Sequence, residues 1–308
     1  MRDISTVRIL LIALTAVVAV SFLPLGFSGY ILGLLTVAYY FGVFAMAWDL
    51  LFGFAGEVNF GPTFLIGTGA YTAGILDNVY QPPIWLCIAA GALAAVIGGV
   101  VLALPALRLR GPYFGLTTLV AVLILQNFIV VDAHLTGGEI GLTVPDVITI
   151  SDAVNYEIAL WFMAVSAAIL FALSRSPVGL ILQASGQDAV QAGALGFNVV
   201  KHKLAAFIIS ALFSGLAGAL MVFYLGSASV GTFIDITVSV QVIIAAVLGG
   251  RRTILGGVLG AVFLIAMSEA LRPIGDLSNF VVFAMALIVI LVFPSGFFGL
   301  LTRSREFS

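Results

Sequence analysis

The sequence predicts an all-α integral membrane protein with about ten hydrophobic helical segments. Of its 308 residues, 62% are apolar and 8% are charged, whereas a soluble domain carries about 25% charged residues. The apolar residues gather in runs close to the roughly 20 residues that a helix needs to cross a bilayer. A soluble chain of this size could not bury so much apolar surface, so we expect a single transmembrane domain over residues 1–308.

The apolar runs can be followed along the chain in order. They cover residues 7–25, 30–52, 61–77, 84–107, 112–131, 156–174, 203–225, 237–249, 254–272 and 277–293. The third and eighth runs are short, so we expect broken or re-entrant helices there. The first run follows Arg2 and Arg8 but lacks a clear small-residue cleavage site, which favours an uncleaved span over a signal peptide.

Basic residues between the runs predict the orientation of the chain. With the N terminus inside, every Lys and Arg except Arg272 is cytoplasmic: Arg2, Arg8, Arg108, Arg110, Arg175, Lys201, Lys203, Arg251, Arg252, Arg303 and Arg305. Cytoplasmic loops of membrane proteins carry an excess of Lys and Arg. We therefore expect an even number of spans, both termini in the cytoplasm, and an outer loop at 132–155.

Small residues recur four apart within several runs. The sets are Ala95 and Gly99, then Ala211, Gly215 and Ala219, then Gly256 and Gly260. Residues four apart share one face of a helix, and small faces let helices approach closely in lipid. We expect these faces to pack helix against helix and to carry no chemistry of their own.

A glycine-rich break, GFAGEVNFGP at 53–62, follows the second run. A carboxylate at membrane depth, such as Glu57, costs roughly 2–4 kcal/mol unless it meets water or a partner. Irregular backbone is tolerated there only beside protein or a water-filled cavity. One interpretation is that the break lines a translocation path, and the other is a plain inner loop with Glu57 in cytoplasmic water. The candidate path residues are Gly53, Gly56, Glu57, Asn59 and Gly61.

Two acidic residues near span ends and a second glycine-rich stretch also stand out in the sequence. Asp49 and Glu269 lie near the ends of predicted spans, where snorkelling or a structural hydrogen bond accounts for them. A second glycine-rich stretch, GGRRTILGG at 249–257, is similar in place and composition to the break at 53–61. Duplicated halves with broken helices are common in transporters, so the two stretches suggest an internal repeat.

The most polar long stretch is RSPVGLILQASGQDAVQAGALGFNVVKHK at 175–203, which we interpret as a cytoplasmic segment. Ser185 can cap a helix there, and Asp188 stands three residues later, at the positive end of the helix dipole. Small residues then recur near one face at helical spacing: Gly186, Ala189, Gly193 and Gly196. Such a helix would let another protein come close. The alternative is an ordinary interhelical loop with one helical turn.

The residue types present exclude several functions. The chain has one cysteine, Cys87, and two distant histidines, His134 and His202, so we expect no disulfide, metal site or Cys/His nucleophile. No GxxxxGK[ST] loop exists to cradle phosphate, and no catalytic triad is plausible. We expect no enzyme and no bound cofactor, and any ATP-driven motor, with its ATP and Mg, would be a separate subunit.

Six stretches, in their order and spacing, resemble the permease subunits of branched-chain amino acid ABC importers, specifically the LivM-type subunit. They are GFAGEVNFGPTFLIGTGAYTAG at 53–74, LRLRGPYFGLTTL at 107–119, TGGEIGL at 136–142, ALGFNVVKHKLAAFIISALFSGLAGAL at 194–220, VLGGRRTILGGVLGA at 247–261 and FPSGFFGL at 293–300. The resemblance covers most of the chain. It implies a multi-pass protein of the cell inner (plasma) membrane that forms the path for branched-chain or related hydrophobic amino acids.

The resemblance also implies partners: a LivH-type second permease, two cytoplasmic ATPase subunits and a periplasmic or extracellular substrate-binding protein, with no nucleic acid. It matches residues 183–198 to the family's coupling loop, which contacts the ATPase. The candidate coupling residues are Ser185, Gln187, Asp188, Gln191, Ala192, Gly193 and Gly196. This loop has less charge than is usual in the family, which leaves open the contacts that hold the ATPase. Arg251 and Arg252 also stand where the family commonly has small or apolar residues, which leaves open what that inner loop does.

Two classes of function remain. The first is an ABC importer permease, and the second is a stand-alone secondary transporter or channel with its own ion coupling. Ion-coupled carriers usually hold several ionisable residues at a midplane site, and this chain offers few, which favours the first. Within the importer class, urea and short amides are alternatives to branched-chain amino acids, because related permeases serve them.

Overall fold

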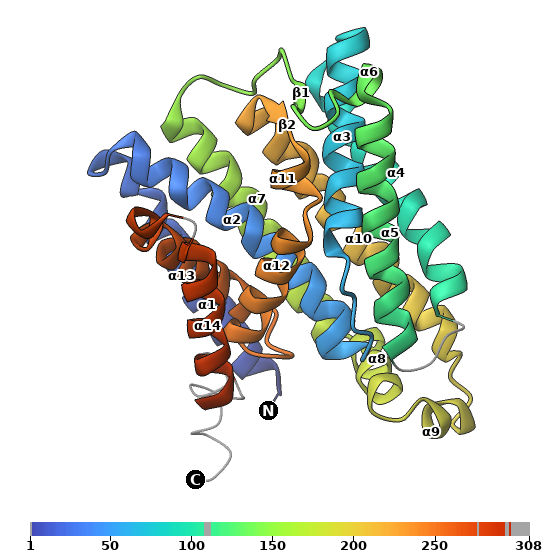
Figure 1. The fold of residues 1–308 in the computed structure, drawn as a ribbon. Helices are drawn as coiled ribbons and strands as arrows, with labels where there is room; N and C mark the ends of the chain where they lie inside the picture. Colours follow the sequence, from blue (N-terminus) through green and yellow to red (C-terminus); the bar gives the residue numbers. More distant parts are fainter. Residues whose placement is uncertain (1, 108–111, 276, 293–295, 297–308) are drawn as a thin grey trace.

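In the computed structural model, residues 2–107, 112–275, 277–292 and 296 are described. They form a helical bundle with a small two-stranded sheet at one end (Figure 1). The longer helices are α1 (Arg2–Ser21), α2 (Gly29–Asp49), α3 (Pro62–Tyr80), α4 (Ile84–Ala106), α5 (Pro112–Val131), α7 (Asp152–Arg175), α8 (Pro177–Gln187), α10 (Val199–Leu225), α12 (Ile236–Gly249), α13 (Gly256–Ala270) and α14 (Leu277–Val292). The shorter elements are η1 (Leu23–Leu25), η2 (Leu50–Phe54), α6 (Ala133–Thr136), β1 (Leu142–Thr143), α9 (Ala189–Ala194), β2 (Ser227–Ala228), α11 (Val230–Phe233) and η3 (Arg272–Ile274).

Some residues singled out by the sequence lie outside the described part of the chain. They are Arg108, Arg110, Arg303 and Arg305 of the basic set, 108–111 of the LRLRGPYFGLTTL stretch, and 293–295 and 297–300 of the FPSGFFGL stretch.

The helices follow the predicted apolar runs, and each of the ten runs holds one. Among the described residues, six helices are long and apolar enough to cross a membrane. They are Gly29–Phe54, Ile84–Ala106, Pro112–Val131, Asp152–Arg175, Val199–Leu225 and Val230–Gly249. Further apolar helices are shorter. The chain is therefore an all-α, multi-pass membrane protein, as expected.

Both short runs form continuous helices. α3 is one continuous helix that begins with Pro62, so the expectation of a break within it is wrong; proline at the first helical position suits a helix start. The eighth run, 237–249, lies within one continuous helix, α12, so the expectation of a break within it is also wrong; the chain leaves the helical conformation at residues 234–235, just before this run, between α11 and α12. There the Asp235 carboxylate accepts the Thr237 N–H at 2.6 Å and caps α12. The main interruption of the chain lies just before α3.

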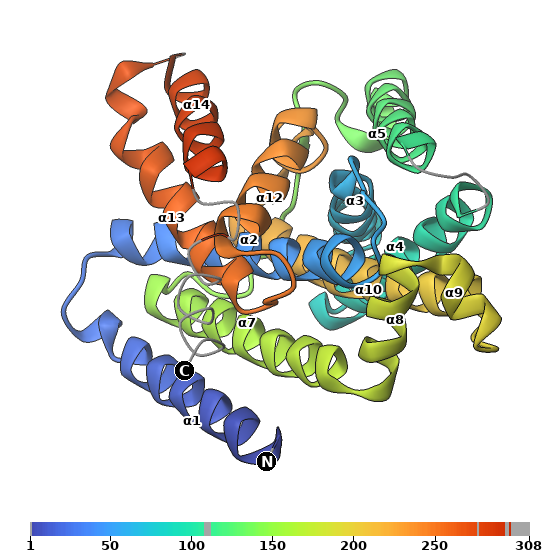
Figure 2. The ribbon, with the colours of Figure 1, turned by 90° about the horizontal axis from the view of Figure 1, so that it is seen from below.

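α2 and α10 occupy the centre of the bundle. α10 packs against α3 and α4, α2 packs against α7, α12 and α13, and the two central helices touch each other. Figure 2, seen from below, shows the two central helices: α2 runs between α7 and the pair α12 and α13, and α10 runs beside α4. Both are mostly buried, and a helix that is buried on all sides must be apolar all round. Each central helix therefore packs against several neighbouring helices and holds them together.

Small residues make the closest helix contacts. A Cβ at Gly99 would lie 2.8 Å from the Cβ of Ala211, and one at Gly215 would overlap the Cβ of Ala95. α12 and α13 meet in the same way, since a Cβ at Gly260 would overlap a carbonyl oxygen of α12. The expectation that these small faces pack helix against helix is confirmed.

The bundle has two distinct ends (Figure 1). α8, α9 and the start of the chain lie at one end, which we call the α9 end. α6, β1 and β2 lie at the opposite end, which we call the sheet end. β1 and β2 pair antiparallel, with Leu142 opposite Ala228, so the loop after α5 is tied to the loop after α10. The positive-inside rule predicts that the α9 end faces the cytoplasm.

Candidate functional site

The α2 helix ends in an irregular segment at the α9 end. Residues 50–54 form a π-helical turn, η2, and single π-helical turns are frequent at functional sites. The chain then turns at Gly56, whose φ of +73° is left-handed and favours glycine. Residues 57–61 contain no helix and lead into α3. The glycine-rich break predicted at 53–62 is therefore present as irregular backbone between two helices.

Asp49 joins this break to the second glycine-rich stretch. The buried Asp49 carboxylate accepts the N–H groups of Arg252 (2.9 Å) and Ile254 (3.0 Å). Arg252 also donates its Nε–H to the Gly53 carbonyl at 2.7 Å. The sequence interpretation of Asp49 as the acceptor of a structural hydrogen bond is confirmed. The two glycine-rich stretches lie against each other, which neither stretch alone could indicate.

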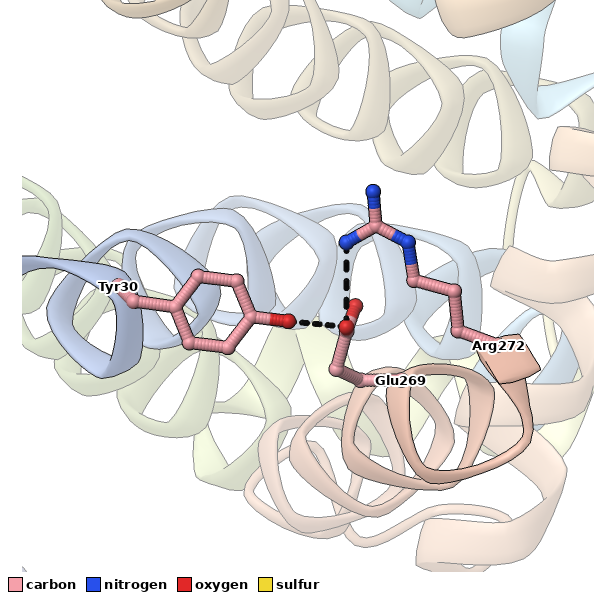
Figure 3. Close-up of polar contacts among 3 residues, drawn as sticks. All are labelled: Tyr30, Glu269 and Arg272. Atoms are coloured by element: carbon pink, nitrogen blue, oxygen red, sulfur yellow. Dashed lines mark hydrogen bonds and ion pairs between the residues drawn. The ribbon is translucent and has the colours of Figure 1, made fainter.

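Glu269 also has a structural role, at the far end of α2. Figure 3 shows Tyr30, at the start of α2, donating its hydroxyl hydrogen to Glu269 Oε1. Arg272 Nη1 lies 3.2 Å from the same oxygen. These contacts connect the start of α2 to the end of α13. Arg272 is the one basic residue that the sequence predicts on the side of the membrane opposite the cytoplasm.

Two of the candidate path residues, Asn59 and Gly61, lie in the packed interior. Asn59 is buried, its carbonyl accepts the Trp48 Nε1–H at 2.6 Å, and its Oδ1 accepts the Gly61 N–H at 2.9 Å. A Cβ at Gly61 would overlap the carbonyl of Thr118 on α5. Asn59 and Gly61 therefore fix the route of the chain into α3.

Gly56 and Glu57 instead line a cavity at the α9 end. The Glu57 carboxylate pairs with Lys203 of α10, with 2.5 Å between Oε1 and Nζ, and both side chains are mostly buried. The cavity holds about 450 Å³ and has residues of the break, α5, α8, α9 and α10 in its wall. Ser185 of α8 lines it too, and the buried Ser185 hydroxyl has no hydrogen-bond partner among the described residues.

The polar stretch at 175–203 contains two short helices, α8 and α9, and then the first residues of α10. Ser185 lies inside α8, so the expectation that it caps a helix is wrong. The cap is Asp188, whose backbone is extended and whose Oδ1 accepts the N–H groups of Val190 and Gln191, each at 2.9 Å. An aspartate in this conformation ends α8 and starts α9, because its carboxylate satisfies the first N–H groups of the next helix.

The predicted small-residue face is divided between two surfaces. A Cβ at Gly186 would lie 2.6 Å from the Phe54 carbonyl, so Gly186 packs on its own chain. Cβ atoms at Gly193 and Gly196 would meet no described atom within 4 Å. Of the other candidates, Gln187 and Gln191 are exposed, whereas Ala192 is buried.

Two apolar side chains on and just after α9 are strongly exposed. Val190 is 80% exposed and Leu195 is 74% exposed. They lie in a segment that the sequence places outside the membrane, where lipid cannot cover them. Contiguous exposed apolar residues of this kind mark interaction sites.

Lys203 is the functional candidate that sequence reasoning missed. The sequence identified it only as a basic residue at the edge of the polar stretch. Its partner Glu57 is 146 positions away, and no local pattern indicates such a pair. Among the described residues, no group of three or more His, Cys, Asp or Glu side chains is arranged to hold a metal ion.

Comparisons with known proteins identify a family and relatives that are similar to this chain. A family model described as branched-chain amino acid transport system / permease component matches residues 30–292. The high-affinity branched-chain amino acid transport system permease protein LivM is 26% identical in Salmonella typhimurium and 27% in Escherichia coli, over 82% of this chain. The match spans 66% of the length of each. LivH of Escherichia coli, from the same kind of system, is 25% identical over 84% of this chain and 91% of its own length.

Proposed function

Because the chain belongs to the family of branched-chain amino acid transport permeases, we propose that it is one membrane subunit of an ATP-driven importer for these amino acids. In this proposal it lies in the cell inner membrane beside a LivH-type second permease. Two cytoplasmic ATPase subunits supply the energy, and a binding protein outside delivers the substrate. The support for the second permease is the similarity of this chain to both LivM and LivH relatives.

The observation that carries the proposal is the exposed surface of α9. α9 projects from one end of the bundle (Figure 1), and it presents Val190, Gly193 and Leu195 to the surroundings. The fully buried centre of a protein interface is more apolar than its solvent-accessible rim. We assign this surface, with the neighbouring Gln187, Gln191 and Gly196, to the ATPase.

The break at 53–62 is the proposed inner part of the translocation path. Glu57 and Gly56 border the cavity at the α9 end, which is where a substrate would leave toward the cytoplasm. Irregular backbone at membrane depth is tolerated where it lines a cavity. Gly53, Asn59 and Gly61 support this segment from behind and do not line that cavity.

Gly193→Trp tests the assignment of α9. A side chain can leave the backbone there without a clash, because Gly193 is exposed and no described atom lies within 4 Å of a Cβ at the position, but a Trp would hold the ATPase away. We expect normal membrane insertion, loss of ATPase copurification and loss of uptake. Gly231→Trp is the control, since Gly231 at the sheet end is equally open and should leave ATPase copurification intact. Normal copurification of the Gly193→Trp permease would contradict the assignment.

Transport in proteoliposomes distinguishes the function classes. The complete complex should accumulate radiolabelled leucine, isoleucine or valine only with internal ATP and external binding protein. Preferential uptake of urea or a short amide would show that the importer serves these solutes instead of branched-chain amino acids. Uptake that needs no ATPase subunit and collapses with an ionophore would identify a secondary transporter instead.

A further inference from the structure

We propose that Gly186 and Lys203 are positioning residues for transport: they form a two-sided clamp that transmits movement of α9 to the break after α2. This inference rests on the proposed function, because it needs an ATPase that moves α9. It joins two regions that the sequence treated separately, the coupling segment and the translocation segment.

The first side of the clamp is a contact of backbone on backbone. A Cβ at Gly186 would lie 2.6 Å from the Phe54 carbonyl oxygen and 2.9 Å from the Ala55 carbonyl carbon. A Cβ at Gly56 would lie 2.8 Å from the Gly186 carbonyl oxygen. Neither glycine carries a side chain that could rotate away, so a displacement of α8 toward the break pushes directly on residues 54–56. Gly186 immediately precedes the last residue of α8, and Asp188 then starts α9.

The second side of the clamp is the ion pair between Lys203 and Glu57. Lys203 lies near the start of α10, just after α9 in the chain, and Glu57 directly follows Gly56. Both side chains are largely withdrawn from solvent, at 14% and 17% exposed. A pair that is shielded from water is screened less than a surface pair, so it resists separation more strongly.

The two contacts come from the two helices that flank α9. α8 leads into α9 and touches the break at Gly56, while α10 leads out of α9 and holds the break at Glu57. The cavity of about 450 Å³ lies between these elements and has Gly56, Glu57, Gly186 and Lys203 in its wall. The clamp therefore has free space beside it, into which the break can move when α9 moves.

The break is suited to receive this movement. η2 is a π-helical turn, Gly56 is in a left-handed conformation, and no helix resumes until Pro62. Segments of this kind change their dihedral angles at lower cost than an intact helix and act as hinges. The packed helices α8 and α10 are rigid by comparison, and rigid elements in contact carry coupling between sites.

The experiment measures ATP hydrolysed per leucine imported by the complete complex in proteoliposomes. Lys203→Met keeps the length of the side chain and removes its charge, and Gly186→Ala forces α8 off the break. We expect each variant to keep ATPase copurification and ATP hydrolysis. The ratio of ATP hydrolysed to leucine imported should rise about fivefold to tenfold, because a factor of this size corresponds to the interaction energy of one contact between coupled residues. Lys201→Met, an exposed lysine on the same helix, and Gly231→Ala are the matched controls and should leave the ratio unchanged.

A charge exchange separates positioning from direct substrate contact. Glu57→Lys combined with Lys203→Glu rebuilds the pair in reverse, so it should restore the ratio to within about twofold of wild type if the pair acts as a clamp. A double variant that stays as impaired as Lys203→Met would overturn the clamp, as would a wild-type ratio in both Lys203→Met and Gly186→Ala. Absence of ATP-dependent uptake in the wild-type complex would instead overturn the proposed function, and the clamp with it.

Discussion

Among single residues, Asp49 does the most to hold the α9 end together. Its carboxylate binds two backbone N–H groups in a loop where Arg252 and Ile254 have φ values of +65° and +54°. A left-handed conformation is uncommon for any residue with a side chain and is an outlier for a β-branched residue such as isoleucine. Backbone of this kind persists only when its surroundings fix it, and here the Asp49 carboxylate is the fixing group. Arg251 adds a further contact, with its guanidinium 4.4 Å from the centre of the Phe52 ring.

Asp49→Ala should therefore destabilise the permease itself. The buried Ile254 N–H would lose its acceptor, and an unsatisfied buried donor costs about 1–3 kcal/mol. We expect a lower thermal unfolding midpoint in detergent, together with less protein in the membrane. The unfolding midpoint of Asp49→Asn should lie between those of wild type and Asp49→Ala. The asparagine side chain has one carbonyl oxygen, so it can replace only part of the hydrogen bonding that the two carboxylate oxygens provide.

Glu139→Ala provides the control for Asp49, because Glu139 is exposed at the sheet end and its loss should not move the midpoint. An Asp49→Ala permease that melts with the wild-type protein would show that the 250–255 loop does not depend on this carboxylate.

Among the elements, α3, α4 and α10 form the most closely packed group. Gly69 and Gly91 face each other across α3 and α4, and Gly215 of α10 fits against Ala95 of α4. Lipid offers no hydrophobic driving force for helix association, so close packing of small residues must provide the attraction. These helices carry glycine where backbones approach, which explains why the small residues recur four apart in the sequence.

Two adjacent glycines of α4 test this packing. A Cβ at Gly99 would lie 2.8 Å from Ala211, whereas one at Gly98 would lie 3.4 Å from an edge atom of the Phe64 ring. Gly99→Val should cost about 1–3 kcal/mol through overpacking and lower the yield and the unfolding midpoint of the permease. Gly98→Val introduces the same side chain one position away and should be tolerated. Equal effects of the two variants on the midpoint would argue against the observed α4–α10 contact.

For the whole molecule, the two ends predict an orientation in the membrane. The sheet end carries the loop between α5 and α7, and the α9 end carries the basic residues Arg175, Lys201 and Lys203. Basic loops remain in the cytoplasm. We therefore expect the sheet end outside, where the proposed binding protein would deliver its substrate.

Single cysteines measure this orientation, after Cys87, the one native cysteine, is replaced. Ile140→Cys at the sheet end, where the side chain is 97% exposed, should react with a membrane-impermeant maleimide in intact cells. Lys201→Cys at the α9 end should react only after the membrane is permeabilised. The reverse pattern would invert the orientation and would place α9 out of reach of a cytoplasmic ATPase.

The sequence by itself determined the class of the protein, the positions of its apolar runs and the location of its irregular segments. These properties depend on local composition: a spanning helix needs about 20 apolar residues, and glycine and proline interrupt it wherever they occur. The sequence also predicted which small residues pack helices together, because a spacing of four defines a helix face. It could not place the cap at Asp188 instead of Ser185, because both residues are good caps and only the extended backbone of Asp188 decides between them.

The tertiary structure alone decided which segments meet. Asp49 binds N–H groups 203 and 205 positions away, and Glu57 binds a lysine 146 positions away. Gly186 and Gly56 touch through backbone atoms, a contact that no side-chain pattern encodes. Contacts of this kind depend on how α2, α8 and α10 pack in three dimensions. That packing depends on residues spread over the whole chain, so no short stretch of sequence predicts it. For that reason the polar stretch at 175–203 and the break at 53–62 are separate in the sequence and adjacent in the fold.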